Sequence, residues 1–355
     1  MLNRRLRPLT LSSKLKRTTQ RFPSRRDSGG CDTRPRAETD ANLATMNQRI
    51  VSLIASGTEI VCALGFEDQL VGRSHECDFP SSIERLPVCS SSKVDVAADS
   101  SEIDSQVRSI VADGLSVYDV DPRILDRLAP TTIVTQSQCE VCAVSLHDVE
   151  RAVCELVGSE PRVVSLEPMC LRDVWKGIRK VASVLGNPER GDELAARLSG
   201  RLQAIHAGPQ TSESRPSIAC IEWIDPLMVA GNWVPDLVDC AGGTDVLGRS
   251  GEHADWIEIE QLLEADPDVI AIMPCGFDIE RASREMAPLA EHPEWERLSA
   301  VRKGRVVITD GNQYFNRPGP RVVESTEILS EVLYPERADF GHRGTGWINW
   351  KESDP

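Results

Sequence analysis

The chain alternates short apolar runs with amphipathic stretches in two separate blocks, and this alternation constrains the fold more than any other feature. Runs typical of buried strands lie at 49–53, 70–73, 132–135, 162–166, 217–222, 268–273 and 305–309. Stretches with the helical spacing of apolar residues separate them. Strands that alternate with helices form mostly parallel sheets with helices on both faces. One longer charged helical stretch, 188–207, stands between the two blocks.

These patterns predict an α/β protein of two lobes, each a mostly parallel sheet with flanking helices, joined by a single long helix. We expect the first lobe at 47–187, the linking helix at 188–210 and the second lobe at 211–335. The last residues, 336–355, show no clear periodicity, and we expect them to form a tail.

The first 46 residues differ in character from the rest of the chain. Residues 1–45 carry eleven Lys and Arg against four Asp and Glu, and they contain no apolar segment of a secretory signal peptide. An organelle transit peptide, a disordered basic arm, and an untranslated stretch before a start at Met46 all fit this composition. We favour the third interpretation, because the first strand pattern begins directly after Met46.

The remaining chain is strongly acidic. Of 40 basic and 55 acidic residues, 29 and 51 lie after residue 45, which leaves a balance of −22 there. An acidic surface repels the phosphate backbone of nucleic acids, so we do not expect nucleic acid as a partner. No run of 18 apolar residues occurs, so no membrane span is predicted.

Cysteine usage bears on the cellular compartment. The eleven cysteines are odd in number, and most stand singly inside apolar stretches. This pattern favours reduced core thiols over a disulfide framework. We therefore predict a cytoplasmic protein, or an organelle protein if residues 1–45 are a transit peptide.

Two loops that follow strands of the first block contain metal-binding residue types. His75 and Cys77 lie in the first loop, and Cys139 and Cys142 lie two residues apart in the second. Because zinc accepts two such thiols with a further Cys and His, a Zn or Fe site is one hypothesis. Core thiols with an ordinary loop histidine are the simpler alternative. His75 alone also suits an axial ligand to the metal of a cofactor.

Aromatic side chains follow strands of the second block. Trp223, Trp233 and Trp256 fall in loops or at helix starts, where a flat ligand is a plausible reason for a large flat side chain. The segment 312–321 places Tyr314, Phe315 and Arg317 beside a helix N-terminus. A surface helix cap is the alternative for Arg317.

No motif in the chain demands catalysis. The sequence contains no Gly-x-Ser-x-Gly elbow, no Walker loop, and no Gly-x-Gly-x-x-Gly after a strand. Ligands of parallel sheets bind at the carboxyl ends of the strands, where the aromatic and polar loops of this chain lie. We therefore expect a binding protein rather than an enzyme.

Several phrases of the sequence resemble a known family. RIVSLIASGTEIVCALG at 49–65, SHECDFP at 74–80, LEADPDVIAI at 263–272 and NRPGPRVVE at 316–324 stand in the order seen in binding proteins for cobalamin and ferric siderophores. Within that family of ABC-transporter substrate-binding proteins, the chain is most similar to the cobalamin binders. The resemblance implies two lobes joined by one long helix, with little hinge closure, as in class III periplasmic binding proteins.

The resemblance also implies a ligand and the residues that hold it. Cobalamin or a related corrinoid would lie in the cleft between the lobes, and a haem or a ferric siderophore is the alternative ligand. The residues that match the family's pocket positions, together with the weaker candidates and the polar residues of the strand-end turns, are Ser56, His75, Phe79, Trp223, Trp233, Trp256, Tyr314, Phe315 and Arg317.

The resemblance further bears on partners. Transport-linked members dock on a permease through one exposed glutamate on each lobe, and Glu260 matches that position in the second lobe. The matching position in the first lobe holds Arg123, a charge reversal that weakens docking on a basic surface. The Cys-Glu-Val-Cys segment is similar to that of a cytosolic-looking branch of the family. We expect a monomer with a small-molecule ligand.

Overall fold

The computed structural model describes residues 48–112, 116–137, 149–150, 152–153, 160–207 and 215–352. Within these ranges the chain forms two lobes on either side of the helix α7 (Pro188–His206). Each lobe is a β-sheet with helices packed against it, which confirms the predicted α/β fold class.

The first lobe contains a parallel sheet in which four strands are described. Their order across the sheet is β2 (Leu70–Arg73), β1 (Ile50–Ser52), β5 (Thr132–Gln136) and β6 (Arg162–Leu166). All neighbouring pairs run parallel. Helices α2 (Ala55–Ala63), α4 (Pro122–Leu128) and α6 (Leu171–Val184) belong to this lobe, with short 3-10 turns at Glu67–Gln69 and Ser81–Arg85. The strands β1 and β5 are buried throughout, as expected for a sheet covered on both faces.

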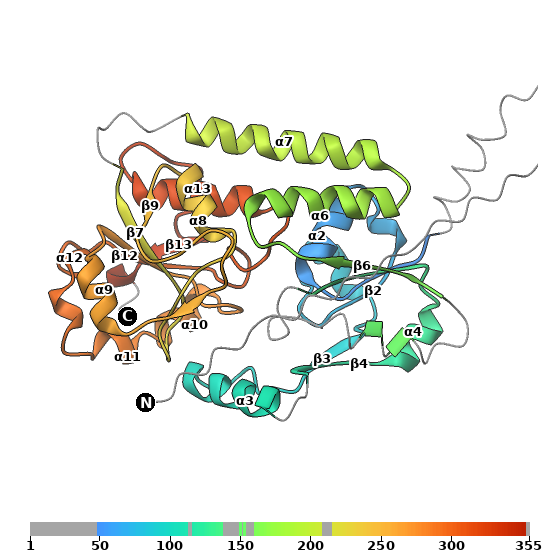
Figure 1. Cartoon of the computed structure of the whole chain (residues 1–355), viewed down its shortest axis with the longest axis horizontal. Helices are drawn as coiled ribbons and strands as arrows, with labels where there is room; N and C mark the ends of the chain where they lie inside the picture. The colour runs from blue at the N-terminus through green and yellow to red at the C-terminus, as the bar shows by residue number, and fades with distance from the viewer. Residues whose placement is uncertain are drawn as a thin grey trace, which may run out of the picture. The chain divides into compact units, whose positions relative to one another are not determined.

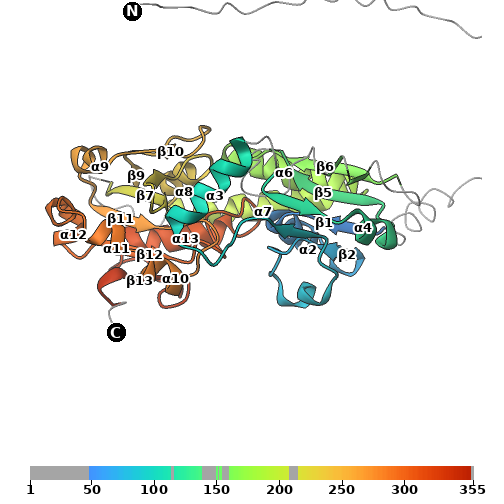
Figure 2. The same ribbon diagram turned by 90° about the horizontal axis from the view of Figure 1, so that it is seen from below.

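A small antiparallel pair extends from the first lobe. It consists of β3 (Ser90–Ser92) and β4 (Tyr118–Val120), with the helix α3 (Ser100–Ala112) between them. In Figure 1, α3 lies at the edge of the molecule opposite α7, and Figure 2 shows it in front of elements of the second lobe.

The second lobe contains a mixed sheet of seven described strands. Their path is β10 (Asp255–Trp256), β8 (Met228–Val229), β7 (Ser217–Trp223), β11 (Val269–Ile272), β12 (Val306–Thr309) and β13 (Trp347–Asn349), with β9 (Thr244–Asp245) paired to β7. The central strands β7, β11 and β12 are parallel, whereas β8, β10 and β13 pair antiparallel.

Short helices surround this sheet. They are α8 (Val234–Cys240), α9 (Ile259–Ala265), α10 (Ile279–Arg284), α11 (Ala287–Ala290), α12 (Ser299–Arg302) and α13 (Val322–Leu333), with 3-10 turns at Trp295–Arg297 and Trp350–Glu352. Residues 279–290 form two helices, α10 and α11, rather than one. Helix α13 begins at Val322, because residues 316–320 form a tight turn before it.

The linking helix α7 packs against α6 of the first lobe and α13 of the second. Asn187 caps its first turn, and Pro188 occupies the first helical position. Arg201 pairs with Glu324 and Glu327 of α13, with N–O distances of 3.0 and 2.7 Å. A single apolar cluster continues from α2 and α6 under α7 into α8 and α13. In the described ranges, no helix is both long and apolar enough to cross a membrane.

Residues 336–352 differ from the predicted tail. The strand β13 pairs antiparallel with β12, and the ring of Trp347 is buried. The indole Nε1 of Trp347 donates a hydrogen bond to the carboxylate of Glu331 in α13 at 2.6 Å. This segment therefore completes the second sheet. Its three-residue strand is too short to produce a recognisable alternation.

Candidate functional site

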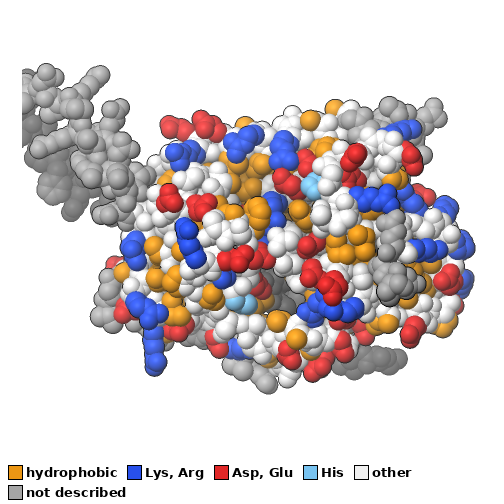
Figure 3. Space-filling model, turned by 180° about the vertical axis from the view of Figure 1, so that it is seen from behind, with side chains coloured by type: hydrophobic (Ala, Val, Ile, Leu, Met, Phe, Trp, Pro, Cys, Tyr) orange, Lys and Arg blue, Asp and Glu red, His pale blue; other side chains and the backbone are white. Residues whose placement is uncertain are grey.

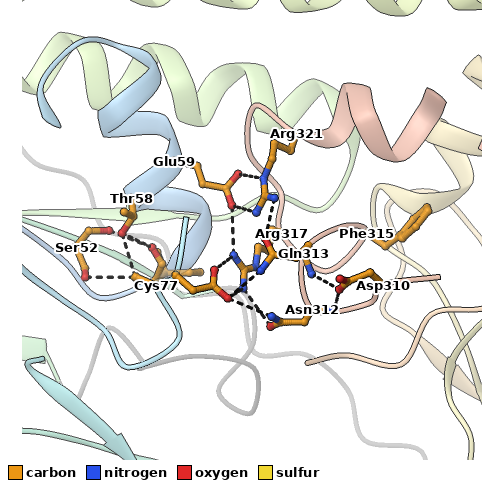
Figure 4. A network of polar contacts seen from close by, with 12 residues as sticks. Ser52, Thr58, Glu59, Cys77, Asp310, Asn312, Gln313, Phe315, Arg317 and Arg321 are labelled. Atoms are coloured by element: carbon orange, nitrogen blue, oxygen red, sulfur yellow. Dashed lines mark hydrogen bonds and ion pairs between the residues drawn. The ribbon is translucent and has the colours of Figure 1, made fainter. Parts of the chain in front are cut away.

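Two ion pairs, one buried and one partly exposed at its carboxylate, join the lobes near the carboxyl ends of their strands. Glu59 lies in α2 and Asp78 follows β2, whereas Arg317 and Arg321 precede α13 (Figure 4). The Arg317 guanidinium donates to both Asp78 oxygens at 2.5 and 3.0 Å. Arg321 donates to both Glu59 oxygens at 3.0 and 2.6 Å. Such paired forks are the strongest hydrogen bonds between these residue types. We call these four residues the charge network.

Two amide side chains complete the charge network. Asn312 and Gln313 donate to Asp78 Oδ2 at 3.1 and 2.9 Å, and the Gln313 carbonyl accepts from Arg321 at 2.8 Å. The Asp310 carboxylate holds the turn by accepting from the backbone N–H groups of Asn312 and Gln313. Each network oxygen thus has a partner from the opposite lobe or from this turn.

Burial sets the electrostatics of the charge network. Glu59 is 3% exposed and Arg317 7%, and a third contact of 3.5 Å joins them. Burial raises the pKa of Glu59, and the two arginines lower it only in part. Burial also acts to raise the pKa of Asp78. The hydrogen bonds and the charge of Arg317 outweigh this effect and hold the pKa of Asp78 below its usual value. Charges this deep are stable only as pairs.

A second set of contacts joins the lobes at the other edge. The Ser100 backbone N–H donates to Glu285 of the second lobe at 3.0 Å, and its carbonyl accepts from the Trp223 indole at 3.2 Å. Arg281 donates to the carbonyls of Val96 and Ala98. These contacts attach α3 and the residues before it, 93–112, to the second lobe. We call this segment the α3 strap.

A polar cluster around His75 lies on the first lobe. His75 Nδ1 is 2.9 Å from the hydroxyl of Ser90, and its ring lies 5.4 Å from that of Tyr118. The Tyr118 hydroxyl donates to Glu76 Oε1 at 3.0 Å, and this oxygen is 4.0 Å from His75 Nε2. We call these residues the His75 cluster.

The protonation states of this cluster follow from its surroundings. Burial, with the charge of Arg73, lowers the pKa of His75, so its imidazole is neutral at pH 7. Burial raises the pKa of Glu76 to about 7, although the Tyr118 hydrogen bond and the Arg317 charge oppose it. A neutral imidazole is the form that binds a metal.

The His75 cluster lies between the two connections of the lobes. It follows β2, three residues before Asp78 of the charge network, and Tyr118 belongs to the strand that leaves the α3 strap. Figure 3 shows a hollow near the middle of one face, with acidic, basic and histidine side chains around it.

Several predicted ligand residues meet at the charge network. The Arg321 guanidinium lies 4.0 Å from the Phe79 ring centroid and 5.5 Å from that of Tyr314. Phe79 is 42% exposed and Tyr314 is half-buried. Arg317 is present as predicted, but its charge is paired with Asp78 inside the protein.

Other predicted ligand residues lie elsewhere. Trp223 stacks on Phe277 at 5.2 Å and binds the α3 strap. Trp256 is exposed, and the guanidinium of Arg108 in α3 lies 5.2 Å from its ring centroid. Both indoles thus hold the strap to the second lobe.

Three predicted ligand residues are buried. The Trp233 indole donates to the backbone carbonyl of Phe315 at 2.7 Å, and both rings belong to the apolar core. Phe315 has a φ of 60°, so its backbone makes the turn that precedes Arg317. Ser56 is 1% exposed, because Gly319 packs on it across the lobes. None of these three side chains faces open solvent.

The hypothetical metal ligands are only partly described. Cys77 is buried, its sulfur is 3.0 Å from the Thr58 hydroxyl, and burial raises its thiol pKa to about 11. Cys139 and Cys142 lie outside the described residues. Among the residues that are described, no group of three His, Cys, Asp or Glu side chains is arranged for a metal ion.

Sequence reasoning missed the partners of the arginines. Glu59, Asp78 and Gln313 stood inside the quoted phrases or beside them, yet no local pattern indicated that they would pair with Arg317 and Arg321. The contact between Asp78 and Arg317 spans 239 positions of the sequence. Glu76 and Tyr118 were missed for the same reason.

The two residues that match the family's permease-docking positions each lie in the first turn of a helix. Arg123 is exposed in the first turn of α4, and Glu260 is exposed in the first turn of α9. Helix α4 belongs to the first lobe and helix α9 to the second. The charge at the two positions is opposite, as the sequence indicates.

Comparison with known proteins identifies the class. The family model of periplasmic binding proteins matches residues 123–313, more than half of the chain. The chain therefore belongs to this family, and the resemblance noted in the sequence is confirmed. It is a substrate-binding protein of the ABC-transporter type with a two-lobe fold.

Individual relatives are distant. An uncharacterized ABC transporter substrate-binding lipoprotein, YvrC, of Bacillus subtilis is 20% identical over 91% of this chain and 90% of that protein. A vitamin B12-binding protein of Vibrio cholerae is 22% identical over 81% and 89%. A periplasmic haem-binding protein of Pseudomonas aeruginosa has a similar structure, with a TM-score of 0.61 and 23% identity over 82% of this chain and 94% of that one. At this identity the likeness to the solved structure shows the fold.

One prediction is wrong. We predicted a cytoplasmic protein from its reduced thiols and missing signal peptide. The matching family is that of periplasmic binding proteins, and the B. subtilis relative is a lipoprotein, which point to a location outside the cytoplasm. Buried thiols such as Cys77 and Cys220 fill core positions, so they say little about the redox compartment.

Proposed function

We propose that this chain binds cobalamin or a related corrinoid between its lobes and delivers it to an ABC-type importer. The observation that carries the proposal is the charge balance of the cleft. Arg317 and Arg321 are already paired with Asp78 and Glu59, so a carboxylate-rich ligand would have to displace a buried pair. A corrinoid is fringed by uncharged amides and needs no such exchange.

Uncharged polar groups stand beside the charge network. The amide side chains of Asn312 and Gln313 and the Tyr314 hydroxyl stand on the turn before α13. Phe79 presents an exposed aromatic ring beside them. An apolar wall with a few convergent polar groups is the usual environment of a large flat ligand. The vitamin B12-binding relatives support the same ligand class.

Haem is the second candidate. His75 and Tyr118 stand with their rings 5.4 Å apart, and both are residue types that bind haem iron. The haem-binding protein with a similar fold supports this alternative. Against it, the propionates of haem would meet arginines whose charge is already paired.

Parallel titrations of the purified protein with hydroxocobalamin and haemin separate the two ligands. We expect saturable binding of hydroxocobalamin at micromolar concentration, measured by equilibrium dialysis, and weaker binding of haemin. No corrinoid binding below millimolar concentration would overturn the proposal. Tight haemin binding with a sharpened Soret band would replace it by the second candidate.

Two phenylalanines provide a matched pair of variants. Phe79 beside the charge network is 42% exposed, and Phe340 near the end of the chain is 44% exposed. If Phe79 lines the ligand, Phe79→Ala should weaken corrinoid binding by about 1–3 kcal/mol. Phe340→Ala should leave the affinity unchanged.

The importer contact forms a separate part of the proposal. Glu260 is exposed in the first turn of α9, where a basic permease surface can reach it. Glu264 is exposed in the same helix and serves as the control. Uptake of labelled corrinoid by cells that depend on this chain should fall with Glu260→Ala and not with Glu264→Ala.

The metal hypothesis for Cys139 and Cys142 remains a separate prediction. Elemental analysis of untagged protein would show zinc or iron at stoichiometric amount if it holds. Metal that disappears with Cys139→Ser would support it, and metal-free protein would remove it. The buried, protonated thiol of Cys77 disfavours its participation.

A further inference from the structure

The His75 cluster is separate from the charge network, although His75 lies only three residues before Asp78. His75 is a quarter exposed, whereas the network residues Glu59 and Arg317 are almost completely covered. Its side chain is held on one side by Ser90 and on the other by the Tyr118 ring. The imidazole is therefore fixed but partly exposed, close in the chain to the turn that carries Asp78.

The hydrogen bond to Ser90 decides which ring nitrogen a ligand meets. Nδ1 lies 2.9 Å from the Ser90 hydroxyl, and Nε2 lies on the opposite side of the ring. Glu76 Oε1 lies 4.0 Å from Nε2, beyond hydrogen-bond distance. That carboxyl is itself held by the Tyr118 hydroxyl. This is the arrangement of metal-binding histidines, in which a second contact orients the ring.

We infer that His75 binds the central cobalt of the corrinoid through Nε2, in the axial position that an exchangeable water occupies in the free ligand. The inference rests on the proposed function, because it needs a corrinoid in the cleft. The inference predicts which axial form of the corrinoid the site prefers. A corrinoid with a labile axial water should bind better than one whose axial ligand is held firmly.

The exchange balances without an oxidant or a base. The bond from cobalt to the water oxygen breaks, and the lone pair of Nε2 forms the new bond to cobalt. The water leaves intact, and the oxidation state of cobalt does not change. The imidazole is neutral beforehand and therefore gives up no proton.

Aquocobalamin and cyanocobalamin test the inference, because cyanide does not leave cobalt readily. We expect wild-type protein to bind aquocobalamin at least about tenfold more tightly than cyanocobalamin. His75→Ala should make the two affinities similar by weakening only the binding of aquocobalamin. The exposed histidine of the second lobe, in the variant His253→Ala, is the control and should keep the wild-type ratio.

The visible spectrum gives an independent readout. Bound aquocobalamin should show the shifted bands of a nitrogen-ligated cobalt with wild-type protein, and unshifted bands with His75→Ala. Ser90→Ala removes only the contact that orients the ring, so it should reduce the affinity ratio without abolishing the shift. Melting temperatures, and the variant His75→Gln, show whether any loss comes from misfolding.

The outcomes separate the inference from the proposed function. Equal affinity of the wild-type protein for both corrinoids, with an unshifted spectrum, overturns the role of His75 and leaves the proposed function intact. Binding of neither corrinoid overturns both. A preference for aquocobalamin that persists in His75→Ala assigns the cobalt ligand to another residue and contradicts the inference.

Discussion

The charge network and the α3 strap both connect the lobes, but they do so by different chemistry. The network consists of carboxylate–guanidinium forks in which Glu59 and Arg317 are almost inaccessible to water, while the Asp78 side chain is 35% exposed. The strap uses backbone groups and aromatic rings close to solvent, with Trp256 48% exposed. Buried charges penalise separation strongly, whereas exposed contacts are exchanged with water at little cost.

The comparison suggests which edge of the molecule can open. The edge beside α7 is held by the charge network and by the apolar cluster that continues between the lobes. The opposite edge is held by the strap. A ligand therefore has an easier route past the strap than past the network.

Removal of a network charge should have the largest effect. Arg317→Ala leaves Asp78 without its main partner and weakens the environment of Glu59. We expect the free energy of unfolding to fall by about 3–5 kcal/mol, measured by urea denaturation. Arg201→Ala, which breaks a more exposed pair with Glu327, should lower it by less than about 1 kcal/mol. Similar losses of unfolding free energy in both variants would contradict the expected difference between the network and a more exposed ion pair.

Removal of a strap contact should have a smaller effect on global stability. Arg281→Ala removes two hydrogen bonds to strap carbonyls and the stacking on Phe277. We expect a loss of about 1–3 kcal/mol. Hydrogen exchange of the amides at 96–108 should accelerate, while that of β1 remains slow. Faster exchange at β1 as well would mean that the strap is not an independent unit.

The carboxyl of Glu76 should make stability depend on pH. Its folded pKa is about 7, above the ordinary value of 4.5, so the folded state holds a proton that the unfolded state releases. Stability from this group is therefore present below pH 4.5 and is lost as the pH rises toward 7. We expect Glu76→Gln to flatten the decline in melting temperature over this range, and Glu280→Gln on the surface to leave it unchanged. A decline unaltered in Glu76→Gln would refute the assignment.

The smallest effect should come from the cation–π contact at the end of the strap. Arg108 lies over Trp256 at 5.2 Å, and both side chains are exposed to solvent. Arg108→Ala and Trp256→Ala should each cost about 0.5–1 kcal/mol in urea unfolding. Arg108 also pairs with Asp104 at 2.7 Å, so the double variant should lose more than Trp256→Ala alone but less than the sum of the two single losses. Fully additive losses would show that Arg108 and Trp256 do not interact.

The sequence predicted much of the fold and less of the site. The longer parallel strands of both sheets were anticipated, because a buried strand leaves a continuous apolar run. The strands β3, β4, β8, β9, β10 and β13 were missed, since two or three residues carry no period. Among the site candidates, Phe79 and Tyr314 lie beside the charge network, whereas Trp233 and Phe315 are core residues.

The buried aromatics show why residue type is an incomplete guide to a site. Trp233 and Trp256 both follow strands of the second block, and the sequence treats them alike. One is 7% exposed and bonded to a backbone carbonyl, and the other is 48% exposed under an arginine. The difference depends on which segments pack above each ring.

The sequence by itself determined the two lobes, the linking helix and the family, because these follow from local periodicity and from phrases of adjacent residues. Only the tertiary structure decided that Arg317 is paired with Asp78, and that His75 faces Glu76 and Tyr118. Ion pairing and ring orientation depend on atoms brought within a few ångströms from distant parts of the chain. No spacing in the sequence records that proximity, so the chemistry of the cleft became visible only once the lobes were folded against each other.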